Sequence, residues 1–290
     1  MIESRAIYFT ALTGILWREA LRFFYQRERF LAALVRPLIW LFIFAAGFRS
    51  VLGVSITPPY ETYITYETYI VPGLVAMIQL FNGMQSSLSM VYDREMGSMR
   101  VLLTSPLPRW YLLLCKLVAG TVVSLFQVYA FLVIAELVLV DLPLWGLITV
   151  APVLIVTGLM LGALGMLLSS TIRQLENFAG IMNFVIFPMF FLSSALYPLW
   201  KMKEASVFIY DICAFNPFTY AVESLRFALY LEFNGQAVLV TVACLAVFFV
   251  LAVVGYDPRK GMIRPGQPSE APAPTRVEAA QKKRAGYGVT

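Results

Sequence analysis

The residues with which an enzyme could do chemistry are scarce in this sequence. Histidine, the commonest metal ligand and general base in proteins, does not occur among the 290 residues. The three cysteines, Cys115, Cys213 and Cys244, lie far apart without metal-ligand spacing, so we expect them to be small core residues. The sequence also lacks a GxxxxGKS or GxxxxGKT motif for holding a nucleotide phosphate. If this protein uses ATP, another chain must bind it.

A more informative pattern is a set of polar residues at helical spacing inside an apolar stretch. They form one stripe, which consists of Asn82, Gln85, Ser86 and Ser89. Polar groups within hydrocarbon usually face a cavity or a neighbouring helix, so the stripe predicts either the lining of a transport pathway or hydrogen bonds between helices. Asn183 presents the same alternatives in a later stretch. Glu136 either takes part in transport or reaches water from near the end of its helix.

The elements that must position these residues are membrane helices. Of the 290 residues, 60% are hydrophobic and 13% are charged, and the mean hydropathy is +0.76. Soluble domains have about 45–50% apolar and about 25% charged residues. Long apolar runs without period-two alternation favour helices over a barrel. We therefore predict an all-α integral membrane protein whose surroundings are the lipid bilayer.

Six apolar stretches are predicted to be transmembrane helices. They are residues 36–52, 69–91, 111–140, 147–170, 178–196 and 237–254. Six crossings place both termini on the same side. All 22 lysines and arginines then lie on that side, except Arg49, Lys201, Lys203 and Arg226. Because basic residues concentrate in cytoplasmic loops, we predict cytoplasmic termini in a protein of the cell (inner) membrane.

The segments outside these spans suggest further features around the membrane domain, residues 36–254. In the cytoplasmic N-terminus, residues 1–35, an amphipathic pattern at about 11–30 predicts an interfacial helix, or else the first turns of a long membrane helix. Residues 197–235 are too charged for a span and too apolar for a free loop, so we expect external helices that re-enter the membrane. The tail, residues 255–290, has the composition of a disordered cytoplasmic segment.

The longest charged interruption in the first two thirds of the chain is residues 92–110, YDREMGSMRVLLTSPLPRW. The positive-inside count makes it cytoplasmic. Residues 93–103 can form a short helix with one apolar side, and Pro106 suits the first turn of the next helix. Such an elbow could dock a partner protein. The plainer alternative is a solvated loop.

Two segments resemble motifs of one protein family. The sequence REMGSMRVLLTSPLPRW is similar to the first cytoplasmic loop of ABC-2 type transporter permeases. The sequence NPFTYAVESLR, with Asn216, Pro217, Tyr220 and Arg226, resembles the family signature that precedes the last span. The two motifs occur in the expected order within a six-span frame. Arg100 is a departure, because the family often has an acidic residue there, and it changes the expected charge pairing with a partner.

The resemblance implies the permease subunit of an ABC exporter rather than an enzyme. Two permease copies, a homodimer, would form the translocation pathway, and ABC ATP-binding subunits would dock on residues 92–110 as a coupling helix. ATP and Mg²⁺ would be bound by those subunits, this chain would bind no cofactor, and no nucleic-acid partner is expected. The coupling residues implied are Glu95, Gly97, Arg100, Pro106 and Arg109. The N-terminal helix would correspond to the family's interfacial connecting helix.

Two other functions are less compatible with the sequence. A secondary transporter driven by an ion gradient needs titratable groups near the middle of its spans, and the sequence offers none there. A membrane-bound lipid-modifying enzyme would need a catalytic cluster, but histidine is absent and the acidic residues lie almost entirely in loops. The sequence does not choose among polysaccharides, lipids and drugs as the substrate, or between a homodimer and a heterodimer.

Overall fold

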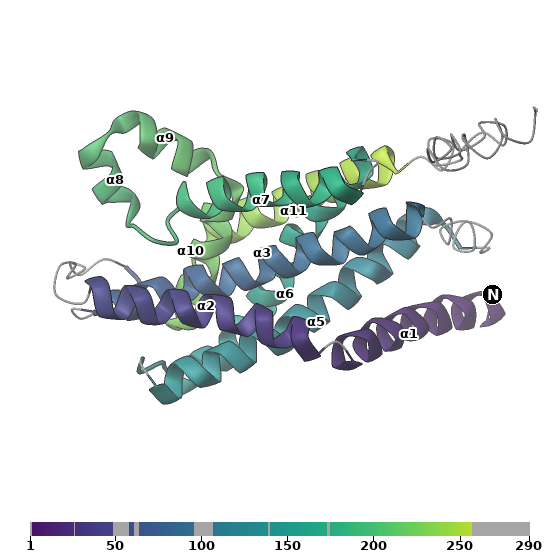
Figure 1. Cartoon of the computed structure of the whole chain (residues 1–290), viewed down its shortest axis with the longest axis horizontal. Coiled ribbons are helices and arrows are strands. Elements are labelled where there is room, and N and C mark those ends of the chain that lie inside the picture. Colours follow the sequence, from purple (N-terminus) through teal and green to yellow (C-terminus); the bar gives the residue numbers. More distant parts are fainter. Residues whose placement is uncertain are drawn as a thin grey trace, which may run out of the picture. The chain divides into compact units, whose positions relative to one another are not determined.

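The computed structural model describes residues 2–25, 27–48, 58–60, 64–95, 107–138, 140–172 and 175–256 (Figure 1). These residues form helices and no strand, which confirms the predicted all-α class for the described part of the chain. The helices are α1 (Ile2–Tyr25), α2 (Arg27–Phe48), α3 (Tyr66–Glu95), α5 (Arg109–Val138), α6 (Leu144–Thr171), α7 (Leu175–Phe191), α8 (Leu199–Ala205), α9 (Val207–Phe215), α10 (Pro217–Leu229) and α11 (Gly235–Gly255).

Three of the described helices are long and apolar enough to cross a membrane. They are Arg109–Leu137, Leu144–Thr171 and Gly235–Gly255, and they coincide with the third, fourth and last predicted spans. The other three predicted spans fall on α2, α3 and α7. Of these, α2 and α7 contain the shorter apolar segments Leu34–Ile43 and Gly180–Phe191, respectively. Helix α3 is more polar than the three long apolar helices. The count of six spans therefore stays a prediction.

Some helix boundaries differ from those predicted. The amphipathic helix begins at Ile2 and ends at Tyr25, and α2 already begins at Arg27. The fifth predicted span ends early, because α7 stops at Phe191 and residues 192–197 form turns. Most of the predicted elbow and the whole predicted tail after residue 256 lie outside the described residues.

Helix α3 is the centre of the packing. It contacts α2, α5, α6, α7 and α10, and Figure 1 shows it running between α2 and α7. Every residue from Tyr69 to Leu80 is buried. A helix that is covered on all sides needs small residues where its neighbours come closest.

Glycines provide that close approach between α3 and α6. The spacing of Gly158, Gly162 and Gly165 on α6 predicts tight helix packing, and the structure confirms it. A Cβ atom on Gly83 of α3 would lie 2.9 Å from the Cα atom of Gly162, and one on Gly165 would lie 2.7 Å from the Gly83 carbonyl oxygen. Neither backbone can accept even a methyl group without moving.

Replacing Gly83 with alanine is therefore expected to lower the free energy of unfolding by about 1–3 kcal/mol, because the two helix backbones must separate. Denaturant unfolding in detergent micelles measures this change. Gly180→Ala on α7 is the matched control, since no described atom lies within 4 Å of the added methyl group. That variant should gain up to about 1 kcal/mol from helix propensity. Equal stability of the two variants would contradict the close α3–α6 contact.

The segment predicted to re-enter the membrane consists of short helices. Residues 197–235 contain α8, α9 and α10, joined by tight turns (Figure 1). The exposed side chains of α9 include large apolar ones, among them Phe208, Ile212 and Phe215. An apolar exposed face of this kind is typical of a helix that contacts lipid or another protein surface. Its insertion into the membrane stays a prediction.

Candidate functional site

A polar cleft lies between α1, α3 and α5. Its lining residues are Glu19, Arg22, Phe23, Asn82, Gln85, Ser86, Ser89, Gly120, Val123 and Gln127. All four residues of the predicted polar stripe therefore line the same cleft. The structure adds charged residues from α1 and an amide from α5 to the stripe.

Within the cleft, Asn82 bonds to the neighbouring helix. Its side-chain amide donates a hydrogen bond to the Oε1 atom of Gln127, which is buried on α5. The Ser89 hydroxyl donates to the Ser86 carbonyl oxygen at 2.6 Å, within α3. The polar stripe was predicted either to line a pathway or to form hydrogen bonds between helices. Asn82 forms such a hydrogen bond, and the other residues of the stripe line the cleft.

A second buried amide on α3 forms hydrogen bonds with α6. Gln79 lies one turn before Asn82, donates to the Leu154 carbonyl oxygen at 2.7 Å and accepts from the Thr157 hydroxyl at 2.7 Å. Sequence reasoning missed both Gln79 and Gln127. The sequence did contain a sign of them: each is a single amide side chain within a long apolar stretch. In the middle of a membrane helix, such a polar group needs a hydrogen-bond partner.

The charges of the cleft come from α1. The Glu19 carboxylate accepts a hydrogen bond from Arg18 at 2.8 Å and lies 3.9 Å from the Arg22 guanidinium. The Arg18 and Arg22 side chains are 52% and 40% exposed, so their attraction to Glu19 is screened by solvent. The cleft therefore offers both signs of charge beside neutral amides and hydroxyls.

Helix α1 lies alongside α5 (Figure 1). At one end the Tyr111 hydroxyl donates to the Tyr8 carbonyl oxygen at 2.7 Å, and the two rings meet edge to face at 4.8 Å. At the other end Arg22 shares the cleft with Gln127. The two helices thus remain together over most of the length of α1. The predicted headgroup-level position of α1 stays a prediction.

The described coupling residues lie at helix ends. Glu95 is the last residue of α3, and Arg109 is the first residue of α5, with an exposed side chain. The other three predicted coupling residues, Gly97, Arg100 and Pro106, lie outside the described residues. The two walls of the cleft that come from α3 and α5 are therefore joined directly by the predicted elbow.

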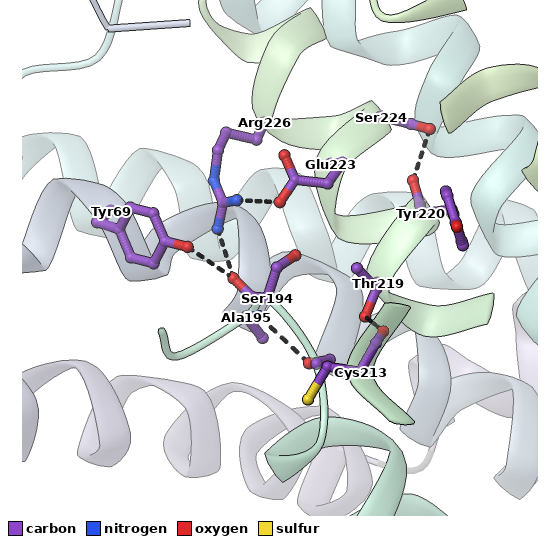
Figure 2. A network of polar contacts seen from close by, with 10 residues as sticks. Tyr69, Ser194, Ala195, Cys213, Thr219, Tyr220, Glu223, Ser224 and Arg226 are labelled. Atoms are coloured by element: carbon purple, nitrogen blue, oxygen red, sulfur yellow. Dashed lines mark hydrogen bonds and ion pairs between the residues drawn. The ribbon is translucent and has the colours of Figure 1, made fainter. Parts of the chain in front are cut away.

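A separate polar network surrounds Arg226 (Figure 2). The guanidinium is buried, forms an ion pair with Glu223 and donates to the Ser194 carbonyl oxygen at 2.7 Å. It lies over the Tyr69 ring at 4.1 Å, and the Tyr69 hydroxyl donates to the same carbonyl at 3.0 Å. Nearby, burial raises the pKa of the Tyr60 hydroxyl to about 12. We call Arg226, Glu223, Tyr69 and Ser194 the arginine clamp. It joins α10, α3 and the turn after α7.

The start of the signature segment fixes α10 against α7. Asn216 is the N-cap of α10 and accepts a hydrogen bond from the Phe218 amide. Its own side-chain amide donates to the Leu192 carbonyl oxygen at 2.6 Å and to that of Met189 at 2.8 Å. Pro217 occupies the first helical position, where no backbone N–H is needed. These contacts are structural.

The remaining predicted site residues lie away from the cleft. Glu136 accepts a hydrogen bond from the Leu142 amide at 2.6 Å and so closes the turn between α5 and α6. Asn183 is exposed on α7, and Tyr220 is half-buried on α10. Cys115 and Cys213 are buried, as expected of core residues, and Cys244 is half-buried. Among the described residues, no three metal-ligating side chains are grouped closely enough to hold a metal ion.

Comparisons with known proteins give one consistent result. The family described as ABC-2 type transporter matches residues 10–230. The chain is similar to a protein of Porphyra purpurea named as a transport permease, ycf38, with 29% identity over 203 residues, or 68% of this chain and 66% of that protein. It is also similar to an Escherichia coli K12 protein named as a multidrug ABC transporter permease, YbhR, with 30% identity over 161 residues. That match covers 54% of this chain and 42% of the relative.

Proposed function

The chain belongs to the ABC-2 type transporter family, and from this premise we propose that it is the permease subunit of an ATP-driven ABC exporter. It is a multi-pass membrane protein by its family and its long apolar helices. In this proposal α2, α3, α5, α6, α7 and α11 cross the cell membrane, and both termini are cytoplasmic. The positive-inside distribution of lysine and arginine supports that topology.

The proposed assembly contains two copies of this chain and separate ATP-binding subunits. Those subunits would supply ATP and Mg²⁺ and dock on residues 92–110. Family membership and the permease names of the relatives support this arrangement. Large exposed apolar side chains on α2 and α7, such as Phe42 and Phe184, offer a surface for the second copy.

The polar cleft is the observation that carries the proposal. Two of its walls, α3 and α5, end at the two sides of the predicted elbow, at Glu95 and Arg109. The third wall, α1, is tied to the first turns of α5 through Tyr111 and Tyr8. A displacement of the elbow by a partner therefore acts on all three walls. We propose that ATP-driven closure of the partner dimer changes access to the cleft in this way.

One observation favours the ion-gradient alternative. Glu19 brings a titratable carboxylate into the cleft, beside Arg22. Secondary transporters couple through groups of this kind. The two functions differ in what drives the change of the cleft, which is ATP in one case and a proton or sodium gradient in the other.

Replacing Glu95 and Arg109 together with alanine is expected to abolish the response of the cleft to ATP while leaving the protein in the membrane. The response can be measured without knowing the substrate. A cysteine introduced by Ser89→Cys, in a chain whose native cysteines are changed to serine, reports cleft access by its rate of maleimide labelling. In the assembled complex this rate should change severalfold on addition of ATP and vanadate.

Two control variants test whether the labelling response depends on the elbow and on ATP hydrolysis by the partner. Lys201→Ala, an exposed change on α8, should leave the ATP response intact. Replacing the P-loop lysine of the partner subunit should remove the response with this chain untouched. A response that survives the partner change, or that follows an imposed ion gradient instead of ATP, would refute the exporter proposal.

A further inference from the structure

A second groove lies between α6, α10 and α11, away from the polar cleft. Its walls include apolar side chains of α6 and α11, among them Val153, Val156 and Val238. The hydroxyl groups that line it donate to carbonyl groups of the protein, as Thr149 does to Ala228 at 2.8 Å and Thr241 to Ala237 at 2.8 Å. Apart from the Glu232 carboxylate, the side chains that line the groove therefore present carbon and hydroxyl groups whose hydrogens are already donated.

The length of the groove corresponds to one leaflet of a bilayer. Along α6 its lining extends from Thr149 to Thr157, which is about 12 Å at the rise of an α-helix. Half of a bilayer's hydrocarbon core is about 15 Å. Both α6 and α11 are long and apolar enough to cross a membrane. The groove thus fits the depth at which an alkyl chain lies in one leaflet.

The turn that ends α10 contributes Leu231, Glu232 and Phe233 to the groove lining, and because all three are exposed we call this part of the groove its mouth. The Glu232 amide donates to the Phe227 carbonyl oxygen at 3.0 Å, and the Leu231 amide donates to that of Ala228 at 3.4 Å. This pair of bonds is the Schellman motif that ends many helices. It holds the exposed side chain of Glu232 at the mouth, where the carboxylate makes no ion pair with any described residue.

Leu231 occupies the position of this turn that normally prefers glycine. Its φ angle is 64°, in the left-handed region, where a residue with a Cβ atom is disfavoured by roughly 1–2 kcal/mol. Glycine would make the turn without that cost, but it would remove a side chain that lines the groove. The chain therefore bears a conformational cost at a position where the leucine side chain forms part of the groove wall.

We propose that this groove binds an amphiphile with a single alkyl chain and a cationic ammonium headgroup. The alkyl chain lies between α6 and α11, and the headgroup lies against the Glu232 carboxylate at the mouth. This site goes beyond the proposed exporter function and does not depend on it.

The test compares two photoreactive probes that share a dodecyl chain carrying a diazirine. One has a trimethylammonium headgroup and the other has an uncharged maltoside headgroup. The full chain is labelled in maltoside micelles, and the modified peptides are identified by mass spectrometry. The cationic probe should label segments of α6, α10 and α11 that line the groove, and the uncharged probe should label them about fivefold less, as for an ion pair of about 1 kcal/mol.

Three variants complete the test. Glu232→Gln should reduce groove labelling by the cationic probe to the level of the uncharged one. Asp211→Asn, which removes an exposed carboxylate on α9, should leave groove labelling by both probes unchanged. Leu231→Gly should keep the chain folded, since it relieves the turn, and should weaken labelling by both probes. Equal labelling by the two probes, or undiminished cationic labelling of Glu232→Gln, would overturn the proposal.

Discussion

Replacing Arg226 with leucine is expected to prevent the chain from accumulating as a folded protein. The substitution leaves the Glu223 carboxylate without its ion-pair partner and removes a donor from the Ser194 carbonyl oxygen and a cation from the Tyr69 ring. Breaking a buried ion pair by removing one partner costs about 3–5 kcal/mol, and because the Glu223 side chain is 19% exposed we expect a loss near the lower end of that range. The loss is a large fraction of the roughly 5–15 kcal/mol that stabilises a typical fold.

Size-exclusion chromatography and thermal unfolding in detergent would measure this loss. The double variant Arg226→Leu with Glu223→Leu should recover much of the stability, because it leaves no charge buried alone. Arg226→Lys should lie between the two, since an ammonium group cannot bond in the planar arrangement of a guanidinium. If Arg226→Leu alone were as stable as the native chain, the arginine clamp would have no structural role.

Replacing Asn82 with leucine is expected to destabilise the chain and to impair transport, and a second change separates the two effects. The single variant leaves the buried amide of Gln127 without its partner, at a cost of about 1–3 kcal/mol. Replacing both residues with leucine removes both polar groups and should restore most of that stability. If the cleft is the pathway, the double variant should fold and assemble but transport about tenfold more slowly, as expected for about 1.4 kcal/mol of lost interaction with substrate.

Unfolding in micelles, cross-linking of the dimer and ATP-driven transport in proteoliposomes give the three readouts for this pair. Gly180→Ala serves as a control for mutation of an exposed helix position. A double variant that recovers stability, assembly and transport together would show that Asn82 and Gln127 serve only to join α3 and α5. A double variant that loses assembly and transport equally would lead to the same conclusion.

The helices of this protein could be predicted from sequence because their signals are local. A long apolar run requires internal hydrogen bonds in a membrane, so each of the six predicted spans falls largely on a helix, although the fifth predicted span extends beyond the end of α7 at Phe191. The polar stripe was recognisable because Asn82 and its neighbours repeat at helical spacing within α3. The glycines of α6 were likewise predicted to pack closely, and Gly162 does so against Gly83.

The partners of these residues could not be predicted, because they depend on contacts between distant parts of the chain. Gln127 reaches Asn82 from another helix, and nothing near it in the sequence indicates that pairing. Glu19 belongs to a helix for which the sequence predicted either an interfacial position or the first turns of a membrane helix, and neither prediction indicated that it lines the same cleft. Arg226 was recognised as part of a signature, but its contact with Tyr69 becomes visible only in the fold.

The arginine clamp also limits how early during synthesis α3 can reach its final packing. A ribosome adds roughly 5–20 residues per second, starting from the N-terminus. Tyr69 is therefore made well before Ser194, whose carbonyl oxygen accepts the hydrogen bond of the Tyr69 hydroxyl, and Arg226 is made later still. Until α10 has been synthesised, the Tyr69 ring of α3 lacks the Arg226 guanidinium that packs against it in the finished protein. The last third of the chain thus completes the packing of a helix made in the first third, and a nascent chain that stalls before α10 leaves that helix unfinished.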